Sequence, residues 1–344
     1  MRRLGVIAVV ALAVTLTACL VRPDDQTRAA PDQARGAAQA FLARYVDADG
    51  RVVRRDQGRD TVSEGQAYAM LLAAAIGDRA RFDPVWGWTR AHLQRDDGLL
   101  AWRPGDPQAA ADADLDAARA LLVAARRFHR PALARQARRI ARAVGAQETA
   151  RVGGRRVLVA GPWARDRAIV NPSYVAPRTF ALLHRRDLRA SGLRVVRTLQ
   201  AHRSGLAPDW ARATAAGATP MGRPDDPGGQ AVFGYDAVRL PIRLAEDCEP
   251  SVRREATQPH ASLQRTLAPV RDLGGKPLAP GEHAVVAVAA AAATAAAGDR
   301  ERAAALLDRA AQLDRAHPSY YGAAWVALGR VMLTTRWLRG CPPM

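Results

Sequence analysis

Apolar residues recur at intervals of three and four along almost the whole chain after residue 30, and this spacing restricts the possible folds more than any other feature. Such a period lines one face of a helix with apolar side chains. We expect helices over residues 31–46, 64–77, 83–95, 112–129, 131–145, 173–186, 188–203, 231–247, 282–297, 299–314 and 318–338. The one exception, residues 149–159, is typical of a small hairpin that turns at Gly153 and Gly154. Because strands do not alternate with helices, the chain is predicted to be all-α with this hairpin as an insertion.

About a dozen helices joined by short turns can be arranged in two ways. They can stack as helix pairs, or they can close into a toroid of inner and outer helices. The Ala-rich run over residues 284–297 has almost no polar face. We therefore expect this run to be packed on every side, as an inner helix of a closed barrel would be. The periodicity alone leaves both arrangements open.

The first residues have the pattern of an export signal. Arg2 and Arg3 precede a short apolar run, and small residues follow it. The run is shorter than the roughly 18 apolar residues that a membrane-spanning helix needs. The sequence Leu-Thr-Ala-Cys over residues 16–19 resembles a bacterial lipobox, which predicts a lipid on Cys19. Ordinary cleavage near Ala18 is the alternative.

These features predict three parts of the chain: a signal peptide with a lipobox over residues 1–19, a flexible tether over 20–30, and one helical domain over 31–344. The protein is expected to be exported, either as a membrane-anchored lipoprotein or in a secreted or periplasmic form. A lipid on Cys19 would be its only contact with a membrane. We expect a monomer.

The net charge of +18 suggests an acidic partner, but the arginines are spread along the predicted helices. Solvated helix faces account for most of this charge, so no nucleic-acid partner is predicted. Cys248 and Cys341 could form a disulfide in an oxidising compartment, and the sequence leaves this open. No paired Cys or His motif has the spacing of a metal site. We expect no metal and no other cofactor.

Three groups of carboxylates stand where helices are expected to begin. Glu64 follows hydroxyl residues at the start of a strongly apolar helix, where it could simply stabilise the helix dipole. Asp112, Asp114 and Asp116 open another helix, and they lack the glycine and the distal glutamate of a calcium-binding loop. Asp236 stands three residues before Arg239, a spacing that also fits an ordinary surface ion pair.

The tryptophans favour a functional over a purely structural role for these carboxylates, because sugar rings stack on indole faces. Five of them lie near the acidic groups or between predicted helices: Trp86, Trp88, Trp102, Trp163 and Trp210. Carboxylates together with exposed tryptophans are typical of a groove that binds polysaccharides.

One segment makes the interpretation specific. Thr-Val-Ser-Glu-Gly-Gln-Ala-Tyr-Ala-Met-Leu-Leu over residues 61–72 resembles the signature of family 8 glycoside hydrolases, which include bacterial endoglucanases. Similar segments follow in the family's order at residues 82–88, 98–102, 112–116, 171–174, 208–210, 235–239 and 320–322. The resemblance implies an (α/α)6 barrel, with a substrate groove across the open ends of the inner helices and a catalytic domain over residues 31–344.

The resemblance also implies roles for individual residues in an inverting hydrolysis. Glu64 would be the general acid and Asp236 the general base, while Asp112 would bind the distorted sugar at the point of cleavage. Arg239 and Tyr174 would hold the attacking water, and Trp102 and Trp163 would stack on sugars. Further substrate contacts are expected from residues inside the same motifs, namely Asp114, Tyr235 and Tyr68.

Two positions depart from the family pattern. Ala113 stands where glycine is commoner, and Arg119 stands where an aromatic residue is frequent, which leaves the subsite preference open. The substrate expected from the resemblance is a β-1,4-linked glucan, with chitosan and xylan as alternatives. More distant alternatives are a lyase acting on an anionic polysaccharide and a non-catalytic glycan-binding protein.

Overall fold

The computed structural model describes residues 23–338 and residue 341, and this part of the chain forms thirteen α-helices. Their bounds are α1 Pro23–Tyr45, α2 Ser63–Ile76, α3 Arg79–His92, α4 Ala111–Arg127, α5 Pro131–Gln147, α6 Pro177–Leu182, α7 Arg186–Gln200, α8 Leu240–Ala245, α9 Pro250–Glu255, α10 His260–Arg265, α11 Ala284–Ala296, α12 Arg300–Ala316 and α13 Tyr320–Thr334. Most of them coincide with the stretches predicted from apolar spacing.

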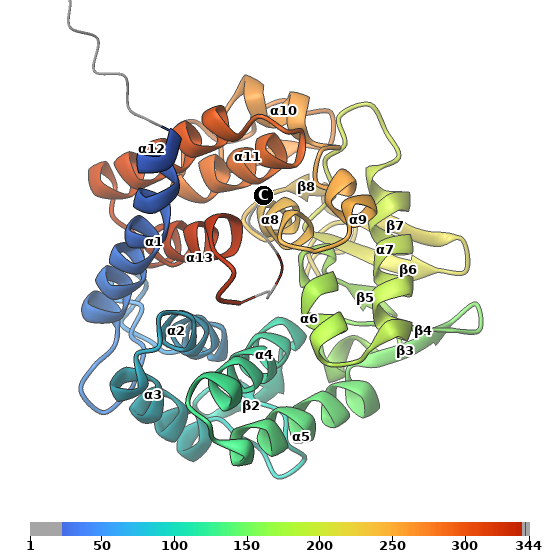
Figure 1. Cartoon of the computed structure of the whole chain (residues 1–344). Coiled ribbons are helices and arrows are strands. Elements are labelled where there is room, and N and C mark those ends of the chain that lie inside the picture. The colour runs from blue at the N-terminus through green and yellow to red at the C-terminus, as the bar shows by residue number, and fades with distance from the viewer. Residues whose placement is uncertain (1–22, 339–340, 342–344) are drawn as a thin grey trace, which may run out of the picture.

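The helices close into a barrel of two layers (Figure 1). Helices α2, α4, α6, α8, α11 and α13 form an inner ring, in which each packs against the next and α13 returns to α2. Helices α1, α3, α5, α7 and α12 lie outside this ring, and the short α9 and α10 lie against α8 and α11. The expected (α/α)6 barrel is confirmed, so the stacked alternative is excluded.

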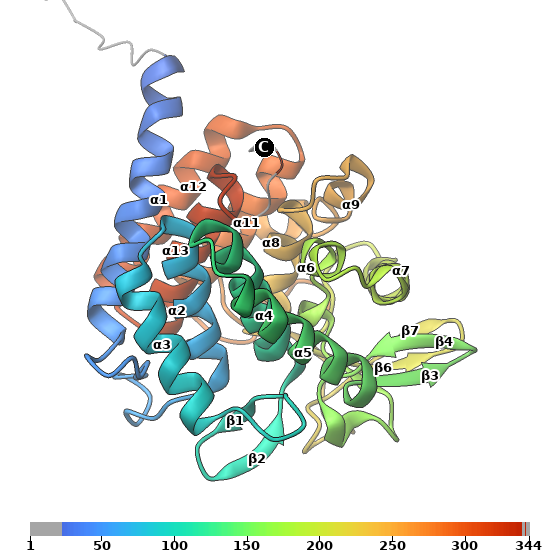
Figure 2. The same cartoon turned by 60° about the horizontal axis from the view of Figure 1, so that its bottom comes forward.

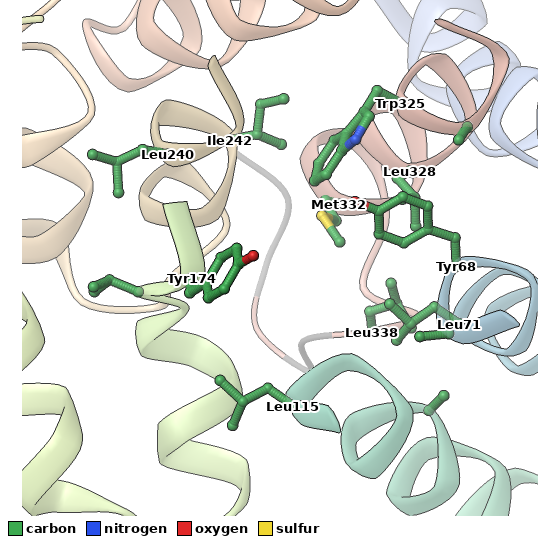
Figure 3. Close-up of a cluster of buried hydrophobic side chains, with 14 of the residues drawn as sticks. Tyr68, Leu71, Leu115, Tyr174, Leu240, Ile242, Trp325, Leu328, Met332 and Leu338 are labelled. Atoms are coloured by element: carbon green, nitrogen blue, oxygen red, sulfur yellow. The ribbon is translucent and has the colours of Figure 1, made fainter. Parts of the chain in front are cut away.

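Sequence composition explains which helices are inside. The Ala-rich α11 is buried from Ala284 to Thr294, as its lack of a polar face predicted. The outer helix α7 instead buries one stripe, which includes Leu188, Val195 and Leu199, and exposes arginines on its other side. Large side chains from several inner elements fill the barrel axis (Figure 3), namely Tyr68, Leu71, Leu115, Tyr174, Leu240, Ile242, Trp325, Leu328, Met332 and Leu338.

Within residues 23–338, nine short strands lie on the barrel, more than the single hairpin predicted. The expected hairpin is present as β3 Thr149–Val152 and β4 Arg155–Leu158. The other strands are β1 Ala101–Arg103, β2 Asp106–Ala109, β5 Ile169–Val170, β6 Trp210–Thr214, β7 Gly217–Met221, β8 Val232–Phe233 and β9 Arg271–Asp272. Strands of two to five residues are too short for a period of two to be recognised. The β3–β4 and β6–β7 hairpins project beside α7 (Figures 1 and 2).

Two predicted helices are wrong over part of their length. Residues 231–247 form β8, a turn, the 3-10 helix η3 Ala237–Arg239 and then α8, because Pro241 fits only the first turn of a helix. Residues 173–186 divide in the same way, since Pro177 stands in the first turn of α6, after the 3-10 helix η2 Pro172–Tyr174. The six-residue α9 and α10 escaped prediction because they complete fewer than two turns.

The structure describes part of each end of the chain. Residues 23–30, assigned to the tether, form the first part of α1, which extends beyond the rest of the barrel in Figure 2. The signal peptide and Cys19 lie outside the described residues. A disulfide joins Cys248 to Cys341, which answers the question that the sequence left open. None of the helices within residues 23–338 has both the length and the apolar character needed to cross a membrane.

Candidate active site

Glu64 stands in the first turn of α2, and its neighbours fix that turn. Gly65 is needed there because a Cβ atom would lie 2.5 Å from the hydroxyl of Tyr320. The buried Gln66 accepts a hydrogen bond from the Val52 N–H and donates to Thr89 Oγ1 at 2.8 Å. The hydroxyl residues before Glu64 do not cap the helix, since Val62 occupies the cap position and no side chain there accepts a capping hydrogen bond. The Glu64 carboxylate is therefore positioned by the close packing at Gly65 and by the hydrogen bonds of Gln66.

Arg239 brings three carboxylates together from separate elements. Its Nη1 donates to Glu64 Oε2 at 2.8 Å and to Asp112 Oδ2 at 2.9 Å. Its Nη2 donates to Asp236 Oδ1. The Arg239 side chain is only 3% exposed, whereas those of Glu64 and Asp236 are 25% and 33% exposed. The pairing of Asp236 with Arg239 is therefore no ordinary surface ion pair.

Two tyrosines surround this cluster from within the barrel. The ring of Tyr174 lies 5.4 Å from the Arg239 guanidinium, a cation–π distance. Tyr68 Oη accepts a weak hydrogen bond from Arg239 Nη1 at 3.4 Å. Tyr68 is buried and contacts the charged groups of the cluster, and the substrate contact expected of it stays a prediction. Both rings limit the movement of the arginine.

Burial and charge together favour a proton on Glu64. Burial is the largest influence and raises its pKa to about 7. Arg239 opposes this effect, Asp112 and Asp236 add to it through charge repulsion, and the hydrogen bond with Tyr68 lowers the pKa slightly. Burial also raises the pKa of Asp112, again against the influence of Arg239. One guanidinium faces three carboxylates, so a proton on one of them reduces their repulsion.

Glu64 and Asp236 line the same open cavity, which has a volume of about 370 Å³. The other residues of its lining are Arg54, Gln57, Tyr235, His283, Ser319 and Tyr321. Tyr235, predicted to bind substrate, is 44% exposed, and its ring packs edge-on against His283 at 5.2 Å. Sequence reasoning missed Tyr321 and His283 as site residues, although both stand near the start of predicted helices and Tyr321 lies in one of the family-like segments.

The tryptophans divide into two groups. Trp86 belongs to the buried core, and the half-buried Trp88 packs on His92 along α3. Trp102 lies in β1, and Trp163 is 36% exposed and packs 6.2 Å from Trp210. Trp102 and Trp163 lie outside the lining of the cavity that holds Glu64 and Asp236.

Two further residues of α4 are fully buried, Asp114 and Arg119. Asp114 is 0% exposed, and its Oδ1 accepts a hydrogen bond from the Leu100 N–H at 2.8 Å, so it has no surface to offer a sugar. Arg119 is equally buried and forms a bidentate ion pair with Glu246 inside the barrel. Arg119 therefore takes no part in a subsite, and its departure from the family pattern is structural.

Three charged residues of α4 form a row of ion pairs with residues of η3, of α8 and directly after α8. The three pairs are Asp112 with Arg239, Asp116 with Arg243, and Arg119 with Glu246, each separated by 127 residues in the chain. Steps of four and then three residues keep these side chains on one face of each helical segment. The row of ion pairs links the three-carboxylate cluster to the interior of the barrel.

Comparisons with known proteins identify the family of this chain. A family model described as Glycosyl hydrolases family 8 matches residues 6–334. A probable endoglucanase from Novacetimonas hansenii is 36% identical over 238 residues, which cover 62% of this chain and 67% of that protein. An endoglucanase from Pseudomonas fluorescens is 31% identical over 227 residues, which cover 58% of this chain and 57% of that protein.

A solved structure gives the same result for the fold. The endo-β-1,4-glucanase from Acetobacter xylinum superposes with a TM-score of 0.74 at 27% identity, covering 88% of this chain and 98% of that one. The family match includes all three motifs whose carboxylates meet at Arg239, together with the barrel that positions them. The chain is therefore a glycoside hydrolase, and it belongs to glycosyl hydrolases family 8.

Proposed function

We propose that this protein is an endo-β-1,4-glucanase that hydrolyses its substrate with inversion, using Glu64 as general acid and Asp236 as general base. The observation that carries the proposal is that these two residues, 172 positions apart, meet the same guanidinium and line the same open cavity. The glucan substrate is supported by the relatives, which are described as endoglucanases.

Glu64 is suited to the role of acid because it can keep its proton near neutral pH. Its pKa of about 7 results first from burial, with repulsion from Asp112 and Asp236 added to it. The protonated carboxyl would donate its proton to the glycosidic oxygen as the bond from that oxygen to the anomeric carbon breaks.

Asp236 is suited to the role of base because Arg239 holds it beside the cavity. A water molecule would transfer one proton to Asp236 while its oxygen forms a bond to the anomeric carbon, on the face opposite the leaving oxygen. The sugar would thus change configuration in a single displacement. Asp112 would accept hydrogen bonds from the hydroxyls of that sugar, and Trp102, Trp163 and Tyr235 would contact neighbouring sugars.

The proposal is tested with Glu64→Gln and Asp236→Asn on a soluble β-1,4-glucan. Each variant should lose about 10²–10⁴-fold in rate, because each replaces a group that transfers a proton by one that cannot. Asp226→Asn, in an exposed loop, is the matched control and should keep normal activity. Reducing ends report the rate, and circular dichroism reports folding. Near-normal hydrolysis by either active-site variant would refute the assignment.

The initial product of the wild-type protein tests the stereochemistry. Inversion at a β-linkage should release the α-anomer first, which proton NMR detects before mutarotation. The same assay on xylan and chitosan compares the alternative substrates, and an ultraviolet-absorbing unsaturated product would indicate a lyase instead. Initial release of the β-anomer would exclude the inverting mechanism.

We also propose that the protein is exported and carries a lipid on Cys19. The disulfide between Cys248 and Cys341 supports an oxidising compartment, where such bonds persist. Labelling with a radioactive fatty acid in a bacterial host should mark the wild-type protein but not Cys19→Ser. An unlabelled wild-type protein would contradict lipidation, and retention in the cytoplasm would contradict export.

A further inference from the structure

Asp236 stands on a turn rather than within a regular helix, so something else must hold it in place. The turn connects β8 to η3, and its internal hydrogen bonds run from the Val238 N–H to the Gly234 carbonyl and from the Arg239 N–H to the Asp236 carbonyl, both at 3.1 Å. A 3-10 helix of three residues has little stability of its own. The direction of the Asp236 carboxylate therefore depends on contacts from outside the turn.

Asp209 makes the main contact of this kind. Its Oδ1 accepts hydrogen bonds from the Gly234 N–H at 2.8 Å and from the Ala237 N–H at 2.7 Å, on either side of Asp236. Its own N–H donates to the Val232 carbonyl at 2.8 Å. A side chain at position 234 would overlap Asp209 Oδ2, so the approach requires glycine there. One carboxylate thus fixes both ends of the turn.

The support behind Asp209 is rigid. Asp209 directly precedes β6, which pairs with β5 and β7 in a three-stranded sheet. The Tyr321 hydroxyl holds the other side of the turn, donating to the Tyr235 carbonyl at 2.6 Å. The turn that carries Asp236 is therefore held between this sheet and α13.

We propose that Asp209 is a positioning residue for the general base: through the Gly234 and Ala237 N–H groups, it fixes the turn that aims Asp236 at the attacking water. This inference rests on the proposed function of Asp236. Displacement of a reacting group by about 1 Å can cost on the order of 100-fold in rate. Loss of the two hydrogen bonds should accordingly reduce turnover more than substrate binding.

The turn requires a hydrogen-bond acceptor at the Oδ1 position of Asp209 and does not require a negative charge there. Burial is the main influence that raises its pKa, to about 7, repulsion from Asp236 adds to it, and the two N–H donors oppose it. At and below neutral pH a neutral side chain with an oxygen at the Oδ1 position can therefore accept the same two hydrogen bonds. Asparagine offers such an oxygen, whereas alanine offers none.

The test compares Asp209→Ala with Asp209→Asn in kcat and KM on a soluble β-1,4-glucan at pH 6. Asp209→Ala should lower kcat by about 10- to 100-fold and change KM by less than about 3-fold. Asp209→Asn should recover most of the loss. In the Asp236→Asn background, Asp209→Ala should cost less than about 2-fold more, because the group that it positions is already gone. Asp225→Ala, in a nearby exposed loop, is the control.

Hydrogen exchange separates failure of this inference from failure of the proposed function. The Gly234 and Ala237 amides should exchange at least about 10-fold faster in Asp209→Ala than in the wild type, whether or not the substrate is correct. Normal kcat in Asp209→Ala, or a full additional loss in the Asp236→Asn background, would overturn the positioning role. A wild-type protein that cleaves none of the polysaccharides would refute the proposed function, and the exchange rates would still test the contact.

Discussion

At the scale of single residues, one guanidinium organises the site. Arg239 pairs with Glu64, Asp112 and Asp236 at once, and it must be buried to reach all three. Burial destabilises every charged form, and a single guanidinium cannot balance three carboxylates. The neutral form of Glu64 is therefore favoured. The elevated pKa of Glu64 is a direct consequence of this arrangement.

The pH dependence of hydrolysis should respond to Tyr68. Glu64, the proposed general acid, would work in its protonated form, so activity should fall as pH rises through about 7, the pKa of Glu64. Tyr68 lowers that pKa by hydrogen bonding, and Tyr68→Phe should therefore move the alkaline limb to higher pH. Initial rates measured from about pH 4 to about pH 9 give the pH profile. Tyr45→Phe, at the buried last residue of α1, is the control, and a shift to lower pH in Tyr68→Phe would contradict the assignment.

At the scale of elements, close packing between inner helices sets which residues are allowed. Helix α13 lies so near to α11 that a Cβ atom at Gly329 would overlap the Cγ1 of Val288. Valine is stiff because it branches at Cβ, so it cannot easily turn away. Gly36, on the outer helix α1, has no atom within 4 Å of the corresponding Cβ position.

These two glycines should respond in opposite ways to alanine. Gly329→Ala should lower the free energy of unfolding by about 1–3 kcal/mol through overpacking. Gly36→Ala should raise it by about 0.5–1 kcal/mol, because alanine loses less backbone entropy in a helix. Urea denaturation followed by circular dichroism measures both changes. Equal effects of the two substitutions would mean that α11 and α13 do not pack as closely as described.

At the scale of the whole molecule, contacts of residues after α13 join parts of the barrel that are far apart in the sequence. The Leu338 carbonyl accepts a weak hydrogen bond from Arg119 Nη2 at 3.4 Å, and Leu338 itself points into the barrel axis (Figure 3). The disulfide then joins Cys341 to Cys248, just beyond α8. Leu338 and Cys341 therefore lie against the buried ion pair of Arg119 with Glu246.

Removal of the disulfide should therefore destabilise the barrel. The bond joins residues 93 positions apart, and closing a loop of this length is worth about 4.6 kcal/mol in the chain-entropy description. The double substitution Cys248→Ser and Cys341→Ser should lower the free energy of unfolding by roughly that amount, and a reducing agent should act similarly on the wild type. Guanidinium denaturation measures it, with Cys19→Ser as the control. Unchanged stability after reduction would show that the bond adds nothing.

The local sequence could not predict how deeply each residue of α4 is buried. Helix geometry could have predicted only the direction in which each side chain points. Asp112 and Asp116 are about 40° apart around α4, whereas Asp114 points about 160° away from Asp112. That separation could have removed Asp114 from the substrate contacts. The burial of Arg119 depends instead on its partner Glu246, which no local pattern identifies.

The sequence by itself determined the helical class, the buried character of α11, the β3–β4 hairpin and the motifs that carry Glu64, Asp112 and Asp236. These features follow from periods and short motifs within one segment. Only the tertiary structure decided which groups meet: Glu64 and Arg239 are 175 residues apart, and Asp209 reaches the turn of Asp236 across 28 residues. Such contacts form because the barrel closes, and closure depends on the packing of all six inner helices at once.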